Sequence, residues 1–136
     1  MEPNKQNTQP VVSAQQHTIL IVEDDPILIK MYKTKFEAEG LKVVTANDGE
    51  TGLKLIKTMS PSLVILDIMM PVLSGIDLLK KYKADLGVIK IPIIVLSNLS
   101  SEDDMKKAFE LGVKEYLVKA NYTPKDVFDH AKKYLG

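Results

Sequence analysis

Five short runs of β-branched and other aliphatic residues recur from Thr18 onward, and the segments between them carry apolar residues at three- and four-residue spacing. Continuous apolar runs this short predict strands buried on both faces, and the intervening spacing predicts amphipathic helices. Their regular alternation predicts βα units, a parallel sheet covered by helices on both faces, and right-handed crossovers. The expected strands are Ile19–Val22, Leu41–Thr45, Leu63–Leu66, Ile91–Leu96 and Val113–Val118.

Chain length decides between the two architectures that a parallel sheet of this kind can adopt. A closed eight-stranded barrel typically needs about 250 residues, and this chain has 136. The sequence therefore predicts an open, doubly wound α/β sheet of five strands. Asp25 before Pro26 predicts a helix start, because aspartate caps helices and proline suits the first turn. Ser100–Asp103 and Thr123–Asp126 resemble capping boxes in which Asp replaces the usual Glu.

Composition excludes several classes of site. The 18 basic residues are all lysines and are balanced by 18 acidic residues, so the chain has no strongly basic field for nucleic acid. Arginine, the side chain best suited to reading guanine, is absent. The chain has no Cys, which excludes disulfides and thiolate sites, and its two His residues lie far apart in the sequence, which argues against a zinc cluster.

The first 16 residues differ in composition from the rest. They contain four Gln and two Asn, with no basic segment followed by an apolar one, so they do not resemble a secretory signal. We expect residues 1–16 to form a disordered tail and residues 17–136 to form one domain. The apolar runs are too short to span a bilayer, and we expect a cytoplasmic protein without membrane insertion.

Polar side chains follow four of the five expected strands. Ligands of open parallel sheets bind outside the carboxyl ends of the strands, where strand order reverses. In the strand order 2-1-3-4-5, the first and third strands are neighbours there, so Glu23, Asp24 and Asp67 are expected to converge. Three carboxylates repel each other and need a cation, and oxygen ligands favour Mg²⁺. Ser97 and Lys119 follow the fourth and fifth strands at the same edge.

This set of side chains suits phosphoryl transfer. An aspartate beside a divalent ion can act as a nucleophile toward a phosphoryl group, and an ammonium and a hydroxyl can hold the oxygens of that group. Taken one at a time, Asp67 is more typical of a turn, Lys119 of a solvated surface and Ser97 of a loop. Their joint placement at one sheet edge favours the functional interpretation.

Four stretches of sequence resemble response-regulator receiver domains of two-component signalling. The resemblance runs in order from Thr18 to the end of the chain and implies a flavodoxin-like fold. The stretches that carry it are Ile19–Pro26, Leu63–Gly75, Ile93–Ser97 and Tyr116–Lys119.

The resemblance implies a role for each residue of the phosphoacceptor site. Asp67 would accept a phosphoryl group from a phosphohistidine on a sensor histidine kinase or a histidine phosphotransfer protein. Asp24 would bind Mg²⁺ directly, Glu23 largely through water, and the backbone carbonyl of Met69 would complete the protein ligands together with Asp67. Lys119 would contact Asp67 and then a phosphoryl oxygen.

The resemblance also implies a switch and an output surface. Ser97 would move to hydrogen-bond the phosphoryl group, and Tyr116 would swing inward behind it. A downstream protein would then bind the face built from the fourth helix, the fifth strand and the fifth helix.

Three positions depart from the family pattern. The site lysine is usually followed by a proline with a cis peptide bond, whereas Ala120 follows here. The Lys119–Ala120 bond is then either trans, with some displacement of the lysine, or cis under strain. Asn98 stands where a small residue is usual, which narrows access to the site. Met69 and Leu99, at the rim, cannot orient a water by hydrogen bonding, so we expect slow self-dephosphorylation.

Rival functions require motifs that the sequence does not contain. It has no P-loop motif, no phosphate-cradling loop after the first strand, and no pair of acids one residue apart followed by Thr, as in phosphatases that use a strand-end Asp. We expect a stand-alone receiver that catalyses only its own phosphorylation and dephosphorylation, or a receiver excised from a longer chain. The alternative left open is a receiver fold that serves as a phosphorylation-independent binding module.

Overall fold

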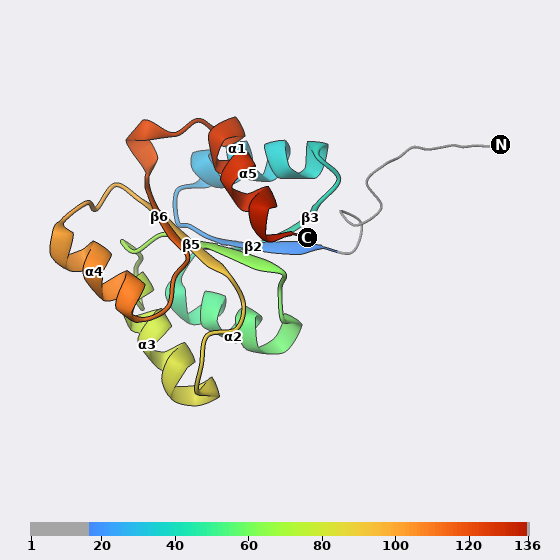
Figure 1. Ribbon diagram of the computed structural model, residues 1–136. Coiled ribbons are helices and arrows are strands. Elements are labelled where there is room, and N and C mark those ends of the chain that lie inside the picture. The colour runs from blue at the N-terminus through green and yellow to red at the C-terminus, as the bar shows by residue number, and fades with distance from the viewer. Residues whose placement is uncertain (1–16, 136) are drawn as a thin grey trace.

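The computed structural model describes residues 17–135, which form a five-stranded parallel sheet with helices on both faces (Figure 1). The strand order β3-β2-β4-β5-β6 confirms the predicted order 2-1-3-4-5. The strands are β2 (Thr18–Val22), β3 (Lys42–Ala46), β4 (Leu63–Leu66), β5 (Ile93–Ser97) and β6 (Glu115–Val118). The helices are α1 (Pro26–Ala38), α2 (Gly49–Met59), α3 (Gly75–Leu86), α4 (Glu102–Glu110) and α5 (Pro124–Ala131), with 3₁₀ turns η2 (Lys119–Asn121) and η3 (Lys132–Tyr134).

The sheet separates two apolar cores. Figure 1 shows α1 and α5 on one face of the sheet and α2, α3 and α4 on the other. Within β2, Leu20 and Val22 pack toward α2 and α3, whereas Ile19 and Ile21 pack toward α1 and α5. Because alternate residues of a strand point to opposite faces, both sets must be apolar. This burial on both faces explains the continuous apolar runs of the sequence.

Three strands begin later than their apolar runs predict, and β3 begins one residue late, at Lys42 rather than Leu41. β5 begins at Ile93 rather than Ile91, and β6 begins at Glu115 rather than Val113. Proline has no amide to donate to a ladder, and Pro92 contributes only its carbonyl, which accepts from the amide of Val64. The amide of Val113 instead bonds to the carbonyl of Ala108 at the end of α4.

Side-chain caps fix the starts of helices that begin at the carboxyl edge of the sheet. Asp25 Oδ1 accepts from the amide of Ile27 at 2.9 Å, and the Thr123–Asp126 capping box is complete. The box predicted at Ser100 is wrong by one residue, since Ser101 is the N-cap of α4 and accepts from the amide of Asp104 at 3.2 Å. Two adjacent serines can cap equally well, so the local sequence does not choose between them.

A charged cluster fastens the C-terminal segment to the sheet. Glu115, at the start of β6, contacts His130 Nδ1 at 2.5 Å, Lys133 Nζ at 3.1 Å and the hydroxyl of Tyr134. Burial raises the pKa of Glu115, but the hydrogen bonds from Tyr134, His130 and Lys133 outweigh it and hold the pKa below its ordinary value. Burial and the hydrogen bond to Glu115 raise the pKa of Tyr134 to about 12.

No helix within residues 17–135 is long and apolar enough to cross a membrane.

We expect Glu115→Gln to destabilise the protein at neutral pH but not in acid. The folded pKa of Glu115 lies below its ordinary value of 4.5, so the unfolded state binds more protons between the two values. The contribution of Glu115 is therefore present above pH 4.5 and is lost as pH falls through the folded pKa. Urea unfolding should show a loss of about 1 kcal/mol at neutral pH, because solvent screens the cluster in part.

The matched control for this experiment is Glu110→Gln on α4, where the glutamate is exposed. A loss of stability for Glu115→Gln that stayed constant from neutral pH into acid would contradict the electrostatic account of the cluster.

Candidate functional site

Backbone pairing brings the strand-end residues to one edge of the sheet. Val22 pairs with Leu66 at the end of the β2–β4 ladder, and Ser97 pairs with Val118 at the end of the β5–β6 ladder. The ladder continues one step further, because the amide of Asp67 donates to the carbonyl of Val22 at 3.0 Å. The residues that follow these strands therefore meet at a common edge, as predicted.

Three carboxylates converge at this edge. Glu23 and Asp67 are buried, with 3% and 5% of their surface exposed, while Asp24 is exposed. One oxygen from each of the three lies within 4.8 Å of the others. The donor set consists of oxygens only, which is the chemistry that suits Mg²⁺.

Lys119 bridges the two buried carboxylates. Its Nζ lies 2.6 Å from Glu23 Oε1 and 3.0 Å from Asp67 Oδ2, and 12% of its side chain is exposed. Burial lowers the pKa of Lys119, but its hydrogen bonds to Glu23 and Asp67 outweigh this effect and leave the pKa above its ordinary value. Burial, together with repulsion from Asp67, raises the pKa of Glu23 despite that ion pair. The lysine therefore stays charged at neutral pH.

The loop between β4 and α3 orients Asp67. The amide of Met69 donates to Asp67 Oδ1 at 3.0 Å, and the amide of Gly75 donates to the carbonyl of Ile68 at 2.9 Å. A Cβ atom at position 75 would lie 2.6 Å from the carbonyl oxygen of Asp67. Position 75 therefore has no room for a side chain, and α3 begins there with its backbone directly against that of Asp67.

Ser97 and Tyr116 meet through the main chain of Leu99. The fully buried Ser97 Oγ accepts from the amide of Leu99 at 3.2 Å, and the hydroxyl of Tyr116 donates to the carbonyl of the same residue. Burial raises the pKa of Tyr116. The two predicted switch residues are therefore connected through a single loop residue.

The Lys119–Ala120 peptide is trans, which decides between the two alternatives left open by the sequence. Lys119 nevertheless reaches Asp67, so a trans bond does not displace its ammonium from the carboxylate. The amide of Ala120 donates to Asn98 Oδ1 at 3.1 Å.

Two contacts that involve Lys119 or the residue after it were absent from the sequence-based prediction. The first is the ion pair of Lys119 with Glu23. The sequence predicted Glu23 only as a metal ligand. The second is the Asn98–Ala120 hydrogen bond. The sequence held a signal for the second, since a non-proline residue after Lys119 adds a donor and Asn98 adds an acceptor at the same sheet edge.

We expect Lys119→Ala to destabilise the protein by about 3 kcal/mol in the absence of divalent ions, because it leaves two buried carboxylates without their cation. Urea unfolding in EDTA measures the loss. The control is Lys125→Ala, since Lys125 also forms an ion pair, with Asp129 at 3.0 Å, but has 73% of its side chain exposed. Equal effects of the two substitutions would contradict the role assigned to the buried bridge.

Comparison with known proteins places the chain in a family. The family model described as response regulator receiver domain matches residues 19–131. The chain is 33% identical over 117 residues to the alkaline phosphatase synthesis transcriptional regulatory protein PhoP of Bacillus subtilis (strain 168), covering 86% of this chain and 48% of that protein. It is 39% identical over 109 residues to the probable transcriptional regulator ycf27 of Guillardia theta, covering 80% and 41%. The chain thus spans about half the length of these curated relatives or less.

Solved structures agree with this assignment. The CheY-like response regulator receiver domain protein from Methanospirillum hungatei JF-1 superposes with a TM-score of 0.80 at 27% identity, covering 88% of this chain and 93% of that one. The receiver domain of the Francisella response regulator 1452 superposes with a TM-score of 0.79 at 31% identity, covering 88% and 96%. The chain therefore belongs to the response regulator receiver domain family.

Proposed function

We propose that this chain is a cytoplasmic phosphoacceptor of a two-component or phosphorelay system, which takes a phosphoryl group on Asp67 from a phosphohistidine donor. Receiver domains are signalling modules, and in this role the chain catalyses only its own phosphorylation and dephosphorylation. The observation that carries it is the buried Asp67 with the Lys119 ammonium 3.0 Å from its Oδ2. Oxygens of Glu23 and Asp24 lie within 4.8 Å of an Asp67 oxygen.

The carboxylate cluster fits Mg²⁺, which when bound neutralises charge on the transferring phosphoryl group. In this proposal Asp24 and Asp67 bind the ion directly, Glu23 holds it largely through water, and the backbone carbonyl of Met69 completes the protein ligands. Because Glu23 Oε1 already faces Lys119 at 2.6 Å, an indirect role for Glu23 is compatible with its present partner.

Asp67 is oriented as a nucleophile by contacts on both of its oxygens. The Met69 amide holds Oδ1 and the Lys119 ammonium faces Oδ2. An oxygen of Asp67 attacks phosphorus, the P–N bond of the phosphohistidine breaks, and the imidazole leaves with the electron pair. Lys119 then pairs with a phosphoryl oxygen, since it already lies at that side of the carboxylate.

The switch follows from the shared partner of Ser97 and Tyr116. When Ser97 Oγ turns to the phosphoryl group, it releases the amide of Leu99. The carbonyl of Leu99 is the acceptor for the Tyr116 hydroxyl, so movement of this loop also frees Tyr116 to swing inward. A change of charge at Asp67 is thereby transmitted to β6, which carries Tyr116.

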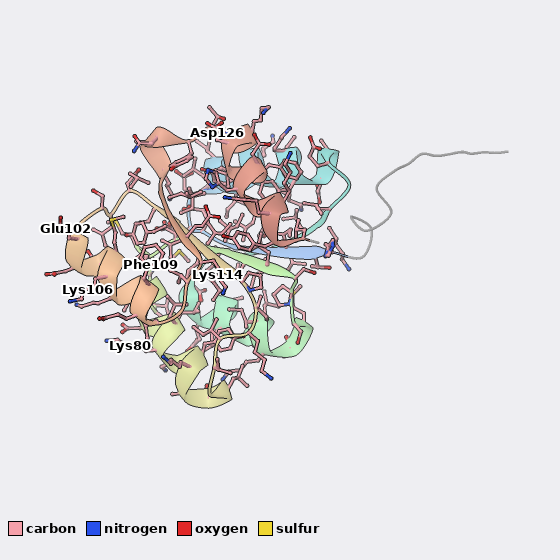
Figure 2. The ribbon with its side chains drawn as sticks, in the orientation of Figure 1. Lys80, Glu102, Lys106, Phe109, Lys114 and Asp126 are labelled. Atoms are coloured by element: carbon pink, nitrogen blue, oxygen red, sulfur yellow. The ribbon has the colours of Figure 1, made fainter. Side chains whose placement is uncertain are left out.

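The output surface in this proposal is the face of α4, β6 and α5, which would bind a downstream protein. Figure 2 shows Lys106 and Phe109 on α4, and Phe109 has 48% of its surface exposed. Phe109 offers an apolar contact beside charged groups, as protein interfaces often do. Relatives are named as transcriptional regulators, but we propose that this chain itself contacts protein and not nucleic acid, because its charges are balanced.

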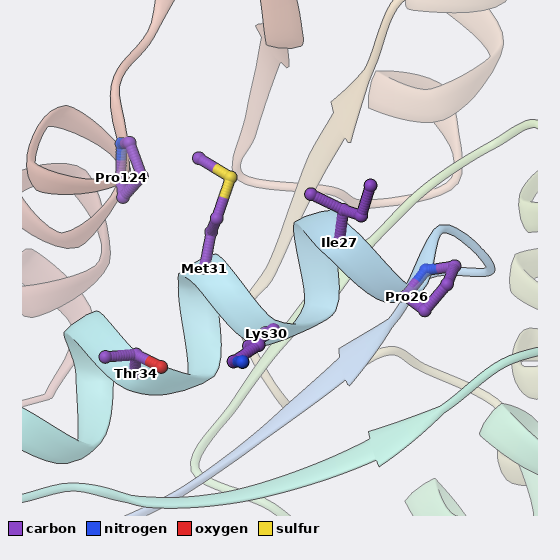
Figure 3. A pocket seen from close by; sticks show the side chains of 6 residues that line it. All are labelled: Pro26, Ile27, Lys30, Met31, Thr34 and Pro124. Carbon is purple, nitrogen blue, oxygen red and sulfur yellow. The ribbon is translucent and has the colours of Figure 1, made fainter.

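The donor protein would contact a groove beside the site. The groove has a volume of about 490 Å³ and is lined by residues of α1 and by Pro124 at the start of α5. Figure 3 shows Ile27 and Met31 projecting from α1, and Ile27 has 70% of its surface exposed. α1 begins directly after the acidic residues and α5 begins shortly after Lys119. A protein that covers the mouth of the site to deliver a phosphoryl group therefore covers this groove as well.

We expect the protein to gain one phosphoryl group on incubation with Mg²⁺ and acetyl phosphate, as measured by intact mass. The adduct should be absent without Mg²⁺ and absent in Asp67→Ala. A folded protein that binds Mg²⁺ but gives no adduct even with histidine kinases would favour the alternative function, a phosphorylation-independent binding module.

Ile27→Glu should slow phosphoryl transfer from a phosphorylated histidine phosphotransfer protein without slowing labelling by acetyl phosphate, because only the protein donor covers the groove. The rate with the protein donor should fall about tenfold, as expected for a charge placed in an apolar contact. Val88→Glu is the matched control, since Val88 is also an exposed apolar residue, at 55%, and lies between α3 and β5. Equal slowing with both donors would argue against this docking surface.

Replacing Met69 with Asn should accelerate loss of the phosphoryl group by about tenfold, because an amide can orient the attacking water and a thioether cannot. Met69 has 57% of its surface exposed. Intact mass followed over time after removal of acetyl phosphate gives the rate, with Met31→Asn as the control. A wild-type lifetime of seconds, lengthened by the Met69 substitution, would contradict the expectation.

A further inference from the structure

The loops that follow β5 and β6 are tied together by a side chain. The parallel ladder between these strands ends at the pair of Ser97 and Val118. Beyond that pair the amide of Ala120 donates to Asn98 Oδ1 at 3.1 Å. An amide N–H needs an acceptor, so the oxygen and not the nitrogen of the Asn98 side chain must face Ala120. A side-chain carbonyl thus continues the pairing where the backbone ladder stops.

This bond fixes the backbone on the far side of Lys119. Val118 is held by the ladder on one side of the lysine, and Ala120 is held by Asn98 on the other. The lysine side chain is long and flexible, and its ammonium must stay within hydrogen-bonding distance of both Glu23 and Asp67. Holding the peptide bonds on both sides of Lys119 restricts where that ammonium can lie.

Two departures from the family sequence pattern, Asn98 and Ala120, together form this hydrogen bond. A proline at position 120 would have no amide, so the donor exists only because the residue is alanine. The acceptor exists because Asn98 stands where a small residue is usual. The trans Lys119–Ala120 peptide presents its N–H to that acceptor.

We propose that Asn98 is a positioning residue for phosphoryl transfer, and that its side-chain oxygen sets the place of the Lys119 ammonium through the amide of Ala120. The proposal rests on the proposed function, because it concerns the lysine that would pair with the phosphoryl group. Asn98 acts through Ala120 and Lys119 and is not itself assigned a contact with the transferring group.

Two substitutions at position 98 test the hydrogen bond itself. Asn98→Leu keeps a branched side chain of similar size but removes the acceptor, whereas Asn98→Asp keeps an acceptor oxygen. Exchange of the Ala120 amide proton, followed by NMR, should accelerate about tenfold in Asn98→Leu and remain slow in Asn98→Asp. Unchanged exchange in Asn98→Leu, or equal acceleration in both variants, overturns the proposal.

The effect on the reaction is measured with Mg²⁺ and acetyl phosphate. Asn98→Leu should lower the rate of phosphorylation at saturating Mg²⁺ about tenfold, because the charge that receives the phosphoryl oxygen is misplaced. The affinity for Mg²⁺, measured by calorimetry, should not fall, since Lys119 is not a metal ligand and its ammonium competes with the ion for Glu23 and Asp67. Comparable losses of rate and Mg²⁺ affinity would show general disruption of the site and overturn a positioning role.

A double-mutant cycle with Ala120→Pro identifies the path of the effect. Proline removes the donor, so Asn98→Leu should change the rate less than about twofold in that background, whatever the effect of Ala120→Pro alone. A full tenfold loss in the proline background would mean that Asn98 acts by another route. If the wild type takes no phosphoryl group, the proposed function fails separately, and the Ala120 exchange data still decide whether the hydrogen bond exists.

Discussion

The contact of one ammonium with two buried carboxylates is the constraint on which the rest of this structure depends. Glu23, Asp67 and Lys119 follow β2, β4 and β6, so each charge comes from a different strand. Uncompensated charges at this depth are strongly destabilising, and only the mutual pairing makes them tolerable. The strand order and the register therefore decide whether each buried charge has a partner. The apolar runs build a sheet whose carboxyl edge brings these groups together. The ion pairs in turn hold the ends of β2, β4 and β6 next to one another.

The loops that follow β5 and β6 are held by a few hydrogen bonds, and they can rearrange when those bonds are exchanged. The amide of Leu99 donates to Ser97 and its carbonyl accepts from Tyr116, so a single loop residue connects the buried hydroxyl to β6. Asn98, one residue earlier, holds the loop that follows β6. A change of charge at Asp67 would act on both loops at once, because hydrogen bonds join the loop after β5 to β6 and to the turn after β6. A few hydrogen bonds that can be exchanged for others allow the loops to adopt two distinct arrangements, as a two-state switch requires.

The position after Lys119 illustrates how a family site can be kept with different chemistry. The chain belongs to the receiver domain family, yet alanine stands where proline is usual. The structure keeps the Lys119 ammonium on Asp67 with a trans peptide and an asparagine acceptor. The ammonium of Lys119 therefore reaches both carboxylates while Ala120 and Asn98 hold the chain beside it. Residues around a buried charge can be understood in pairs when the structure shows which donor faces which acceptor.

The sequence by itself determined the order of strands and helices, the open sheet and the edge at which Glu23, Asp24, Asp67, Ser97 and Lys119 gather. These features follow from local patterns, since burial on both faces fixes the strands and the residues after each strand must lie at its carboxyl end. Only the tertiary structure decided which groups pair. Asp67 and Lys119 are 52 residues apart, and Asn98 and Ala120 are 22 apart. The choice of Ser101 over Ser100 as the cap of α4 was also seen only in the structure, whereas a trans bond before alanine is the ordinary local preference. Pairing depends on distances of a few ångströms between side chains. The separation of two residues along the chain does not give that distance, because it depends on where the folded sheet positions the loops.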